Sequence, residues 1–319
     1  NHLEAVLGIY ADVVRHPHLP DDQLEDARMV CVQELRSIED DLQQKALQEL
    51  RWLQYGHPYG RAATGTLASL QALTLDDVQQ HFLQFYAPDR AILGVAGKLD
   101  WDRLRDRVGT LLGDWQPKPT DLLQEVPCGE QARHLPADST QTHIAVSYAS
   151  VPYSDPRYFE ARAAVGVLSD GMSSRLFTEI RENRGLCYSV YASCHSLRDR
   201  GCVQCYAGTT TDRAQETLDV LIAELRQLAT GIRSDELERL QARIKSALIM
   251  PQESSASRSQ SIAADWYHLG RVYQLEELRR IVDGLTCEKI NAYLSENPPR
   301  DFRIVTLGEQ PLEHPVGIS

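Results

Sequence analysis

The chain has 319 residues. This is longer than a chain that folds around one hydrophobic core usually is, so we expect two domains. It is 42% hydrophobic and 24% charged, a composition typical of globular proteins, and its formal net charge of −12 argues against a surface for nucleic acid or an anionic membrane. No apolar run approaches the roughly 20 residues that cross a bilayer. Its seven cysteines are scattered and odd in number, which argues against a secreted disulfide framework.

The expected elements of the first 115 residues are almost all helices. Apolar residues recur at helical spacing from Leu3 onward. Asp21 and Asp22 suit the N-terminus of a second helix, and Thr74 with Asp77 predicts a capping box. The expected helices span 3–14, 21–38, 42–54, 74–86 and 101–112, and the apolar sequence AILGVA at 91–96 predicts a short strand.

Strands and helices are both expected in the second half. Residues 116–135 contain three prolines and few large apolar side chains, so we expect a linker there. Cys202 and Cys205 form the one close cysteine pair, but they face opposite sides of an expected strand, which disfavours a metal or redox site. The expected strands are 142–148, 202–207 and 302–307, and the expected helices are 158–168, 214–228, 235–248 and one that begins at Thr286. For the polar stretch 252–260 we expect either a loop or a frayed helix end.

A helix followed by a strand is predicted for residues 171–190, with the sequence GMSSRLFTEIRENRGLCYSV. Two serines can cap the helix, and Gly185 ends it. Arg181 then lies at the end of the helix and Tyr188 at the start of the strand. A guanidinium and a phenol on two rigid elements can both reach one polarised oxygen. The alternative is a charge at a helix C-terminus and a half-buried strand aromatic.

The two halves of the sequence repeat one another, in the same order and with nearly constant spacing. We therefore expect two copies of one α+β unit, the first incomplete at its N-terminus, with a start roughly eighty residues before residue 1. The copies differ at the position where Glu34 of the first copy corresponds to Ala247 of the second, which suggests a functional role for Glu34. The ordinary alternative is that Glu34 is a solvent-exposed carboxylate on the surface of a helix. The matched pairs are Asp22 with Asp235, Leu73 with Leu285 and Gly97 with Gly308, at separations of 213, 212 and 211 positions.

Several motifs together resemble the pitrilysin/insulinase family of zinc peptidases, in the bacterial two-domain branch similar to mitochondrial processing peptidase. They are SSRLF at 173–177, IRE at 180–182, the segment 185–190, HPYG at 57–60 with Gly65, and the helix carrying Arg28 and Glu34. The resemblance covers the whole chain. It implies an α+β fold of two duplicated α/β-roll domains that form a clamshell. In it, 1–115 would be the C-terminal part of the catalytic, zinc-binding half, 116–135 the linker, and 136–319 the second, non-metal-binding half.

The resemblance also implies roles for three residues. Glu34 matches the third ligand of a Zn²⁺ site whose other ligands are the histidines of an H-x-x-E-H motif. Arg181 and Tyr188 match the pair that grips the substrate backbone and the developing oxyanion. Neither H-x-x-E-H nor H-E-x-x-H occurs in this sequence. We therefore expect an incomplete zinc site, and a chain that is a fragment without hydrolytic activity of its own.

The function that follows is that of a zinc metalloendopeptidase acting on peptides or unfolded proteins, which works with a second copy or a partner half. An alternative is a non-catalytic family member that serves as a peptide-binding or assembly subunit. A helical scaffold would leave the duplication and the Glu34 asymmetry unexplained. The sequence leaves the substrate and the compartment open.

Overall fold

The computed structural model describes residues 2–119, 123–249 and 254–314. The chain divides into two compact units that interleave along the sequence. The helix α3 (Leu42–Tyr55) belongs to the second unit, and most of α10 (Ser255–Leu269) belongs to the first. Unit 1 comprises 1–37, 62–123 and 254–266, and unit 2 comprises 38–61, 124–253 and 267–319.

The regular secondary structure in the described residues of unit 1 consists of helices, joined by non-helical segments. The capping box is confirmed: the Thr74 hydroxyl accepts from the Asp77 N–H at 3.2 Å, and the Asp77 carboxylate accepts from the Thr74 N–H at 2.8 Å. None of the helices in the described ranges of the chain has the length and apolarity that a membrane crossing requires. Besides α10, the helices of this unit are α1 (Leu3–Arg15), most of α2 (Leu24–Asp40), α4 (Leu67–Ala72), α5 (Leu75–Phe85) and α6 (Trp101–Leu112), with single 3-10 turns at Asp21–Gln23 and Pro88–Arg90.

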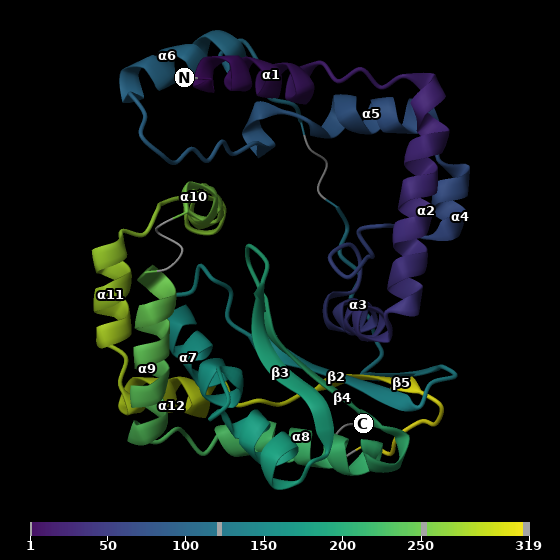
Figure 1. Ribbon diagram of the computed structural model, residues 1–319, viewed down its shortest axis with the longest axis vertical. Helices are drawn as coiled ribbons and strands as arrows, with labels where there is room; N and C mark the ends of the chain where they lie inside the picture. Colours follow the sequence, from purple (N-terminus) through teal and green to yellow (C-terminus); the bar gives the residue numbers. More distant parts are fainter. Residues whose placement is uncertain (1, 120–122, 250–253, 315–319) are drawn as a thin grey trace. The chain divides into compact units, whose positions relative to one another are not determined.

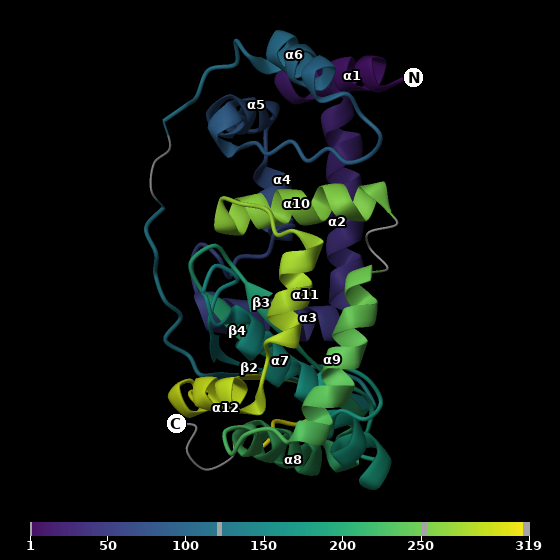
Figure 2. The same cartoon turned by 90° about the vertical axis from the view of Figure 1, so that its left-hand side faces the viewer.

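Helices α1 and α6 run side by side (Figures 1 and 2). Arg103 of α6 pairs with Glu4 at 2.6 Å, and Arg15 donates to the Leu111 carbonyl at 2.5 Å. Ala11, which is on the same face of α1 as these contacts, is buried. One face of α1 is therefore fixed against α6.

The expected strand at 91–96 is wrong. These residues have no secondary structure, and within the described part of unit 1 they have no strand to pair with. They lie against α10 so closely that a Cβ on Gly94 would be 2.4 Å from the Ser259 carbonyl oxygen. An apolar run becomes a strand only when a neighbour takes up its backbone N–H and C=O groups, and the described residues of unit 1 provide no such neighbour.

Unit 2 is built around a mixed sheet with the strand order β1-β5-β2-β4-β3. β1 pairs parallel with β5, and the other neighbours are antiparallel. The expected strands at 142–148, 202–207 and 302–307 and the strand expected to start near Tyr188 are confirmed, whereas β1 begins at Ala132, inside the segment expected to be a linker. The strands are β1 (Ala132–Pro136), β2 (Gln141–Ser150), β3 (Cys187–Ser196), β4 (Gly201–Thr210) and β5 (Arg303–Gly308).

Helices cover both faces of this sheet (Figures 1 and 2). On one face α3 packs Leu50 and Leu53 against Val305 and Leu307 of β5. The larger core lies on the other face, under α7, α8 and α12. The polar stretch 252–260 is helical from Ser255 on, and its first residues lie outside the described ranges. The remaining helices of unit 2 are α7 (Tyr158–Ser169), α8 (Ala214–Leu228), α9 (Ser234–Ile249), α11 (Leu275–Asp283) and α12 (Cys287–Glu296).

Candidate functional site

Arg181 is carried by a short π-helical segment, η3 (Phe177–Asn183). Buried Ile180 fixes it to the core of unit 2, and the Leu186 N–H donates to the Ile180 carbonyl at 2.9 Å across the turn. Gly185 takes the left-handed conformation that this turn needs, with a φ of 58°. The position and the end of the expected helix are confirmed, but its type is not, because π-helical turns carry no simple sequence signal.

The expected serine cap of this helix is wrong. No side chain caps the start of η3. The Ser174 hydroxyl oxygen is instead buried without a hydrogen-bond partner among the described residues. Arg175, immediately after it, fixes this end of the segment.

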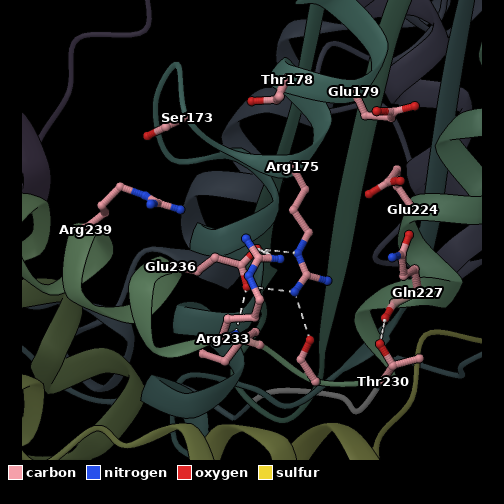
Figure 3. Close-up of a pocket in the computed structure, with 12 residues that line it drawn as sticks. Ser173, Arg175, Thr178, Glu179, Glu224, Gln227, Thr230, Arg233, Glu236 and Arg239 are labelled. Carbon is pink, nitrogen blue, oxygen red and sulfur yellow. Dashed lines mark hydrogen bonds and ion pairs between the residues drawn. The ribbon is translucent and has the colours of Figure 1, made fainter. Parts of the chain in front are cut away.

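Figure 3 shows how Arg175 is held. Its guanidinium makes two hydrogen bonds of 2.8 Å with the Glu236 carboxylate and a third, of 2.9 Å, to the Gly231 carbonyl. The two side chains are only 13% and 6% exposed. Burial opposes the ionisation of Glu236, but the hydrogen bonds from Arg175 and from the Arg233 N–H outweigh it and lower the pKa of this carboxyl. The pair ties the start of the η3 segment to the N-terminus of α9.

Tyr188 is the extra residue of a β-bulge at the start of β3. Cys187 lies opposite Thr209 and Ser189 lies opposite Gly208, so Tyr188 has no partner in the ladder. Bulges re-aim a side chain relative to its sheet. The Tyr188 side chain accordingly stands out of the sheet and is 85% exposed.

The structure brings Arg181 and Tyr188 together. The guanidinium carbon of Arg181 lies 5.4 Å from the centre of the Tyr188 ring and 4.9 Å from that of Phe177. Stacking on aromatic rings holds the guanidinium plane without using its N–H groups. Neither the guanidinium of Arg181 nor the hydroxyl of Tyr188 has a hydrogen bond or ion pair with the described residues. The pair therefore presents free donors to a ligand.

A hollow of about 800 Å³ lies beside Tyr188, between the ends of β2, β3 and β4 and the N-terminus of α3. His143 and Tyr206 share a hydrogen bond of 2.7 Å on its floor. Next to them the Gln43 amide donates to the Tyr191 hydroxyl at 3.1 Å. Burial lowers the pKa of His143 and raises that of Tyr206. The floor of the hollow thus offers neutral hydrogen-bonding groups and aromatic surface near the cationic Arg181, and Asp41, Asp212 and Arg213 add charged groups to its lining.

The sequence did not predict that His143 and Tyr206, on the floor of the hollow, would be candidate site residues. His143 and Tyr206 were both in or next to expected strands, and the two-residue period of a strand puts His143 on the face opposite Ile144. Their contact depends on the register between β2 and β4, which no local pattern contains.

Glu34 is exposed on α2, in unit 1. Its carboxylate has no hydrogen bond or ion pair with the described residues. Across the described ranges no three His, Cys, Asp or Glu side chains gather as a metal ion would require. One carboxylate does not hold zinc, so the described residues do not by themselves fit a zinc site.

The comparisons with known proteins agree with the resemblance drawn from the motifs. A family model described as the peptidase M16 inactive domain matches residues 72–244, more than half of the chain. The chain belongs to the peptidase M16 family. Its relatives include the uncharacterized zinc protease YmxG of Bacillus subtilis, 26% identical over 96% of this chain and 75% of that protein. An uncharacterized zinc protease of Mycobacterium tuberculosis is 28% identical over 96% of this chain and 72% of its own length.

Solved structures give the same fold for this M16 chain. The crystal structure of a peptidase M16 inactive domain from Pseudomonas fluorescens has a TM-score of 0.84 at 23% identity, over 98% of this chain and 76% of that one. A protease from Helicobacter pylori has a TM-score of 0.83 at 18% identity, over 96% of this chain and 76% of that one. These likenesses confirm the α+β fold.

Proposed function

We propose that this M16 chain is the substrate-gripping part of a zinc metalloendopeptidase, in which Arg181 and Tyr188 bind the backbone of an extended peptide. The observation that carries the proposal is the bulged, 85% exposed Tyr188 with the Arg181 guanidinium over its ring, beside the 800 Å³ hollow. The family and the names of the relatives support it.

The chemistry of the pair suits a peptide carbonyl. A phenol O–H and a guanidinium N–H are both donors, and a carbonyl oxygen accepts from both. Negative charge grows on that oxygen when a peptide bond is attacked, and charge-assisted donors that are already in place stabilise it more than they stabilise the substrate. The neighbouring hollow is large enough for a side chain of the bound peptide.

In this proposal Glu34 is one zinc ligand, and the remaining ligands come from outside the described residues. Zinc, when bound, supplies the activated water of a metallopeptidase. Because the described residues contribute a single ligand, the chain alone is expected to bind peptides without cleaving them. In a protein that carries the other ligands, Glu34→Gln would lower zinc affinity by an order of magnitude or more, and unchanged zinc content would remove Glu34 from the site.

Peptide binding tests the proposal on the chain as it exists. Fluorescence anisotropy of a labelled, unstructured 20-residue peptide measures Kd. Arg181→Ala removes a charged donor and should weaken binding by roughly 10-fold or more; Tyr188→Phe removes a neutral donor and should weaken it by about 2- to 10-fold.

The chain contains a matched control pair. Arg198 lies 6.0 Å from the ring centre of Tyr267, which is also exposed, but neither residue lines the hollow. Arg198→Ala and Tyr267→Phe should leave Kd unchanged. If the two pairs of variants affect Kd equally, the gripping role of Arg181 and Tyr188 is wrong.

A second candidate function is a non-catalytic peptide-binding or assembly subunit. Two findings favour it: the matching family model is described as an inactive domain, and a chain of complex III2 from Candida albicans has the same fold, with a TM-score of 0.81. Both functions predict peptide binding, and they differ in hydrolysis. Cleavage of the bound peptide in a protein with all its zinc ligands would decide for the peptidase.

A further inference from the structure

The β-bulge at Tyr188 sets the face of the sheet on which the side chains of β3 lie. Cys187, before the bulge, and Val190, after it, both pack into the larger core under α7, α8 and α12. They are three positions apart, and residues three apart in a regular strand lie on opposite faces. The extra residue of the bulge absorbs this difference, so that both parts of β3 turn apolar side chains to the same core.

Without the bulge, the Tyr188 side chain would point into this core. Val190 is opposite Ala207, and an unbroken ladder continued from this pair would bring Tyr188 opposite Thr209. Its side chain would then lie on the same face as those of Val190 and Ala207. Tyr188 instead lines the hollow and is 85% exposed. Its place in the candidate site therefore depends on the bulge.

The Thr209 hydroxyl holds the chain where the bulge begins. Thr209 lies on β4 opposite Cys187 and is 4% exposed. Its hydroxyl donates to the Leu186 carbonyl at 2.6 Å, and the Leu186 N–H donates to the Ile180 carbonyl at 2.9 Å. A buried carbonyl that loses its donor is costly, so the bond from Thr209 fixes Leu186 and with it the start of the bulge.

The start of α8 supports this arrangement. The hydroxyl of Thr217, which is fully buried, donates to the Arg213 carbonyl at 2.8 Å and lies 3.2 Å from the Thr209 hydroxyl oxygen. The Arg213 guanidinium donates to the Gly185 carbonyl. The carbonyls of Gly185 and Leu186 are thus both bound by side chains from the junction of β4 and α8.

We propose that Thr209 is a positioning residue for Tyr188. By holding the Leu186 carbonyl, its hydroxyl fixes the bulge that turns the tyrosine toward the hollow. The inference rests on the proposed function, in which Tyr188 donates to a bound peptide. Thr209 acts on the peptide through Tyr188, because the one proton of its hydroxyl is already donated to Leu186.

Three substitutions isolate the hydroxyl of Thr209. Thr209→Val removes it and keeps the branched shape of the side chain, and Thr209→Ser keeps it. Thr142 is the matched control, because it lies opposite Thr209 on β2 and is also buried. Its hydroxyl oxygen has no hydrogen-bond partner among the described residues. Thr142→Val therefore removes a hydroxyl from the same row of the sheet without breaking a hydrogen bond.

Amide hydrogen exchange tests the bulge in the chain without peptide. In Thr209→Val the Leu186 amide should exchange at least about 10-fold faster, while amides of β2 and β5 keep their rates. Thr209→Ser and Thr142→Val should leave the exchange of Leu186 unchanged. Equal acceleration throughout the sheet would show that Thr209 only stabilises unit 2, and would overturn the proposal.

A second variant tests the same turn at an exposed position. Arg213→Ala removes the bond to the Gly185 carbonyl from a side chain that is 51% exposed, so the variant should fold. It should also speed exchange of the Leu186 amide, by about 2-fold or more. If the Leu186 amide keeps its rate in Arg213→Ala, and Thr209→Val either does the same or fails to fold, the proposal is overturned.

Peptide binding connects the bulge to Tyr188. Thr209→Val should weaken binding of the labelled 20-residue peptide by about 2- to 10-fold, and Thr209→Ser should restore it. In the Thr209→Val background Tyr188→Phe should cause little further loss, whereas in the Thr142→Val background it should keep its full effect. Losses that multiply independently would overturn the proposal. If Tyr188→Phe changes Kd in no background, the proposed function fails, and the exchange of Leu186 still decides whether Thr209 fixes the bulge.

Discussion

Replacing Arg175 by alanine should destabilise unit 2 by breaking the buried pair with Glu236. The guanidinium makes three hydrogen bonds of 2.8 to 2.9 Å, and its removal leaves a carboxylate that is 6% exposed. Loss of one partner of a buried pair costs about 3–5 kcal/mol. Since the Arg233 guanidinium remains 3.3 Å from Glu236, we expect the lower end, about 3 kcal/mol.

The assay is urea and thermal unfolding followed by circular dichroism. For a unit of this size, about 3 kcal/mol corresponds to a fall in Tm of roughly 6–12 °C. Arg239→Ala is the control, because Arg239 pairs at 3.0 Å with an Asp235 that is half exposed, and it should cost less than about 1 kcal/mol. Equal losses for Arg175→Ala and Arg239→Ala would refute the reasoning.

The pH dependence of the stabilisation by the Arg175–Glu236 pair follows from the direction in which the pKa of Glu236 is shifted. The folded pKa of Glu236 is below its ordinary value of 4.5, so the unfolded chain binds more protons in this range. The stabilisation is complete above pH 4.5 and is lost as the pH falls through the folded pKa. The difference in Tm between the unchanged chain and Arg175→Ala should therefore shrink in acid; a difference that is constant down to pH 3 would contradict the assignment.

Three further predictions concern the polar groups on the α3 side of the sheet. Tyr55→Phe removes hydrogen bonds to His195 at 2.9 Å and to Cys202 at 3.2 Å, and should lower the free energy of unfolding in urea by about 1–2 kcal/mol. Burial lowers the pKa of His143 below 6.5, although the nearby Asp41 carboxylate opposes this shift. The folded chain should therefore lose stability as the pH falls below 6.5. Tm measured against pH should show this decline, and His143→Gln should make it smaller. Burial raises the pKa of the Cys202 thiol to about 11, so alkylation at pH 7.5, mapped by mass spectrometry, should be much slower in the folded chain than in urea.

Local sequence patterns predicted the elements that depend on local chemistry. The capping box at Thr74 and the end of the helix just before Gly185 depend on contacts within a few residues, and both are confirmed. The periodicity of 214–228 matches α8 from end to end. The sequence also predicted that Arg181 and Tyr188 lie on adjacent elements. They are seven positions apart, one at the end of a helix and the other at the start of the next strand, so they must lie near each other.

What the sequence could not predict depends on distant partners. Residues 91–96 have the composition of a strand but lack a neighbouring strand among the described residues. The β-bulge that exposes Tyr188 exists only in the register of β3 against β4. The ion pair of Arg175 and Glu236 joins residues that are 61 positions apart, and no local sequence pattern at either residue predicts this contact.

The most direct test of the gripping surface is photo-crosslinking from Tyr188. A benzoylphenylalanine at this position, in the otherwise unchanged chain, is irradiated with the unstructured peptide, and the adducts are mapped by mass spectrometry. The same replacement at Tyr267, the other exposed tyrosine with an arginine over its ring, is the control. We predict that position 188 forms a peptide adduct that unlabelled peptide competes away, and that position 267 forms none. Equal adducts at both positions, or none at 188, would contradict the proposal that Arg181 and Tyr188 bind the substrate.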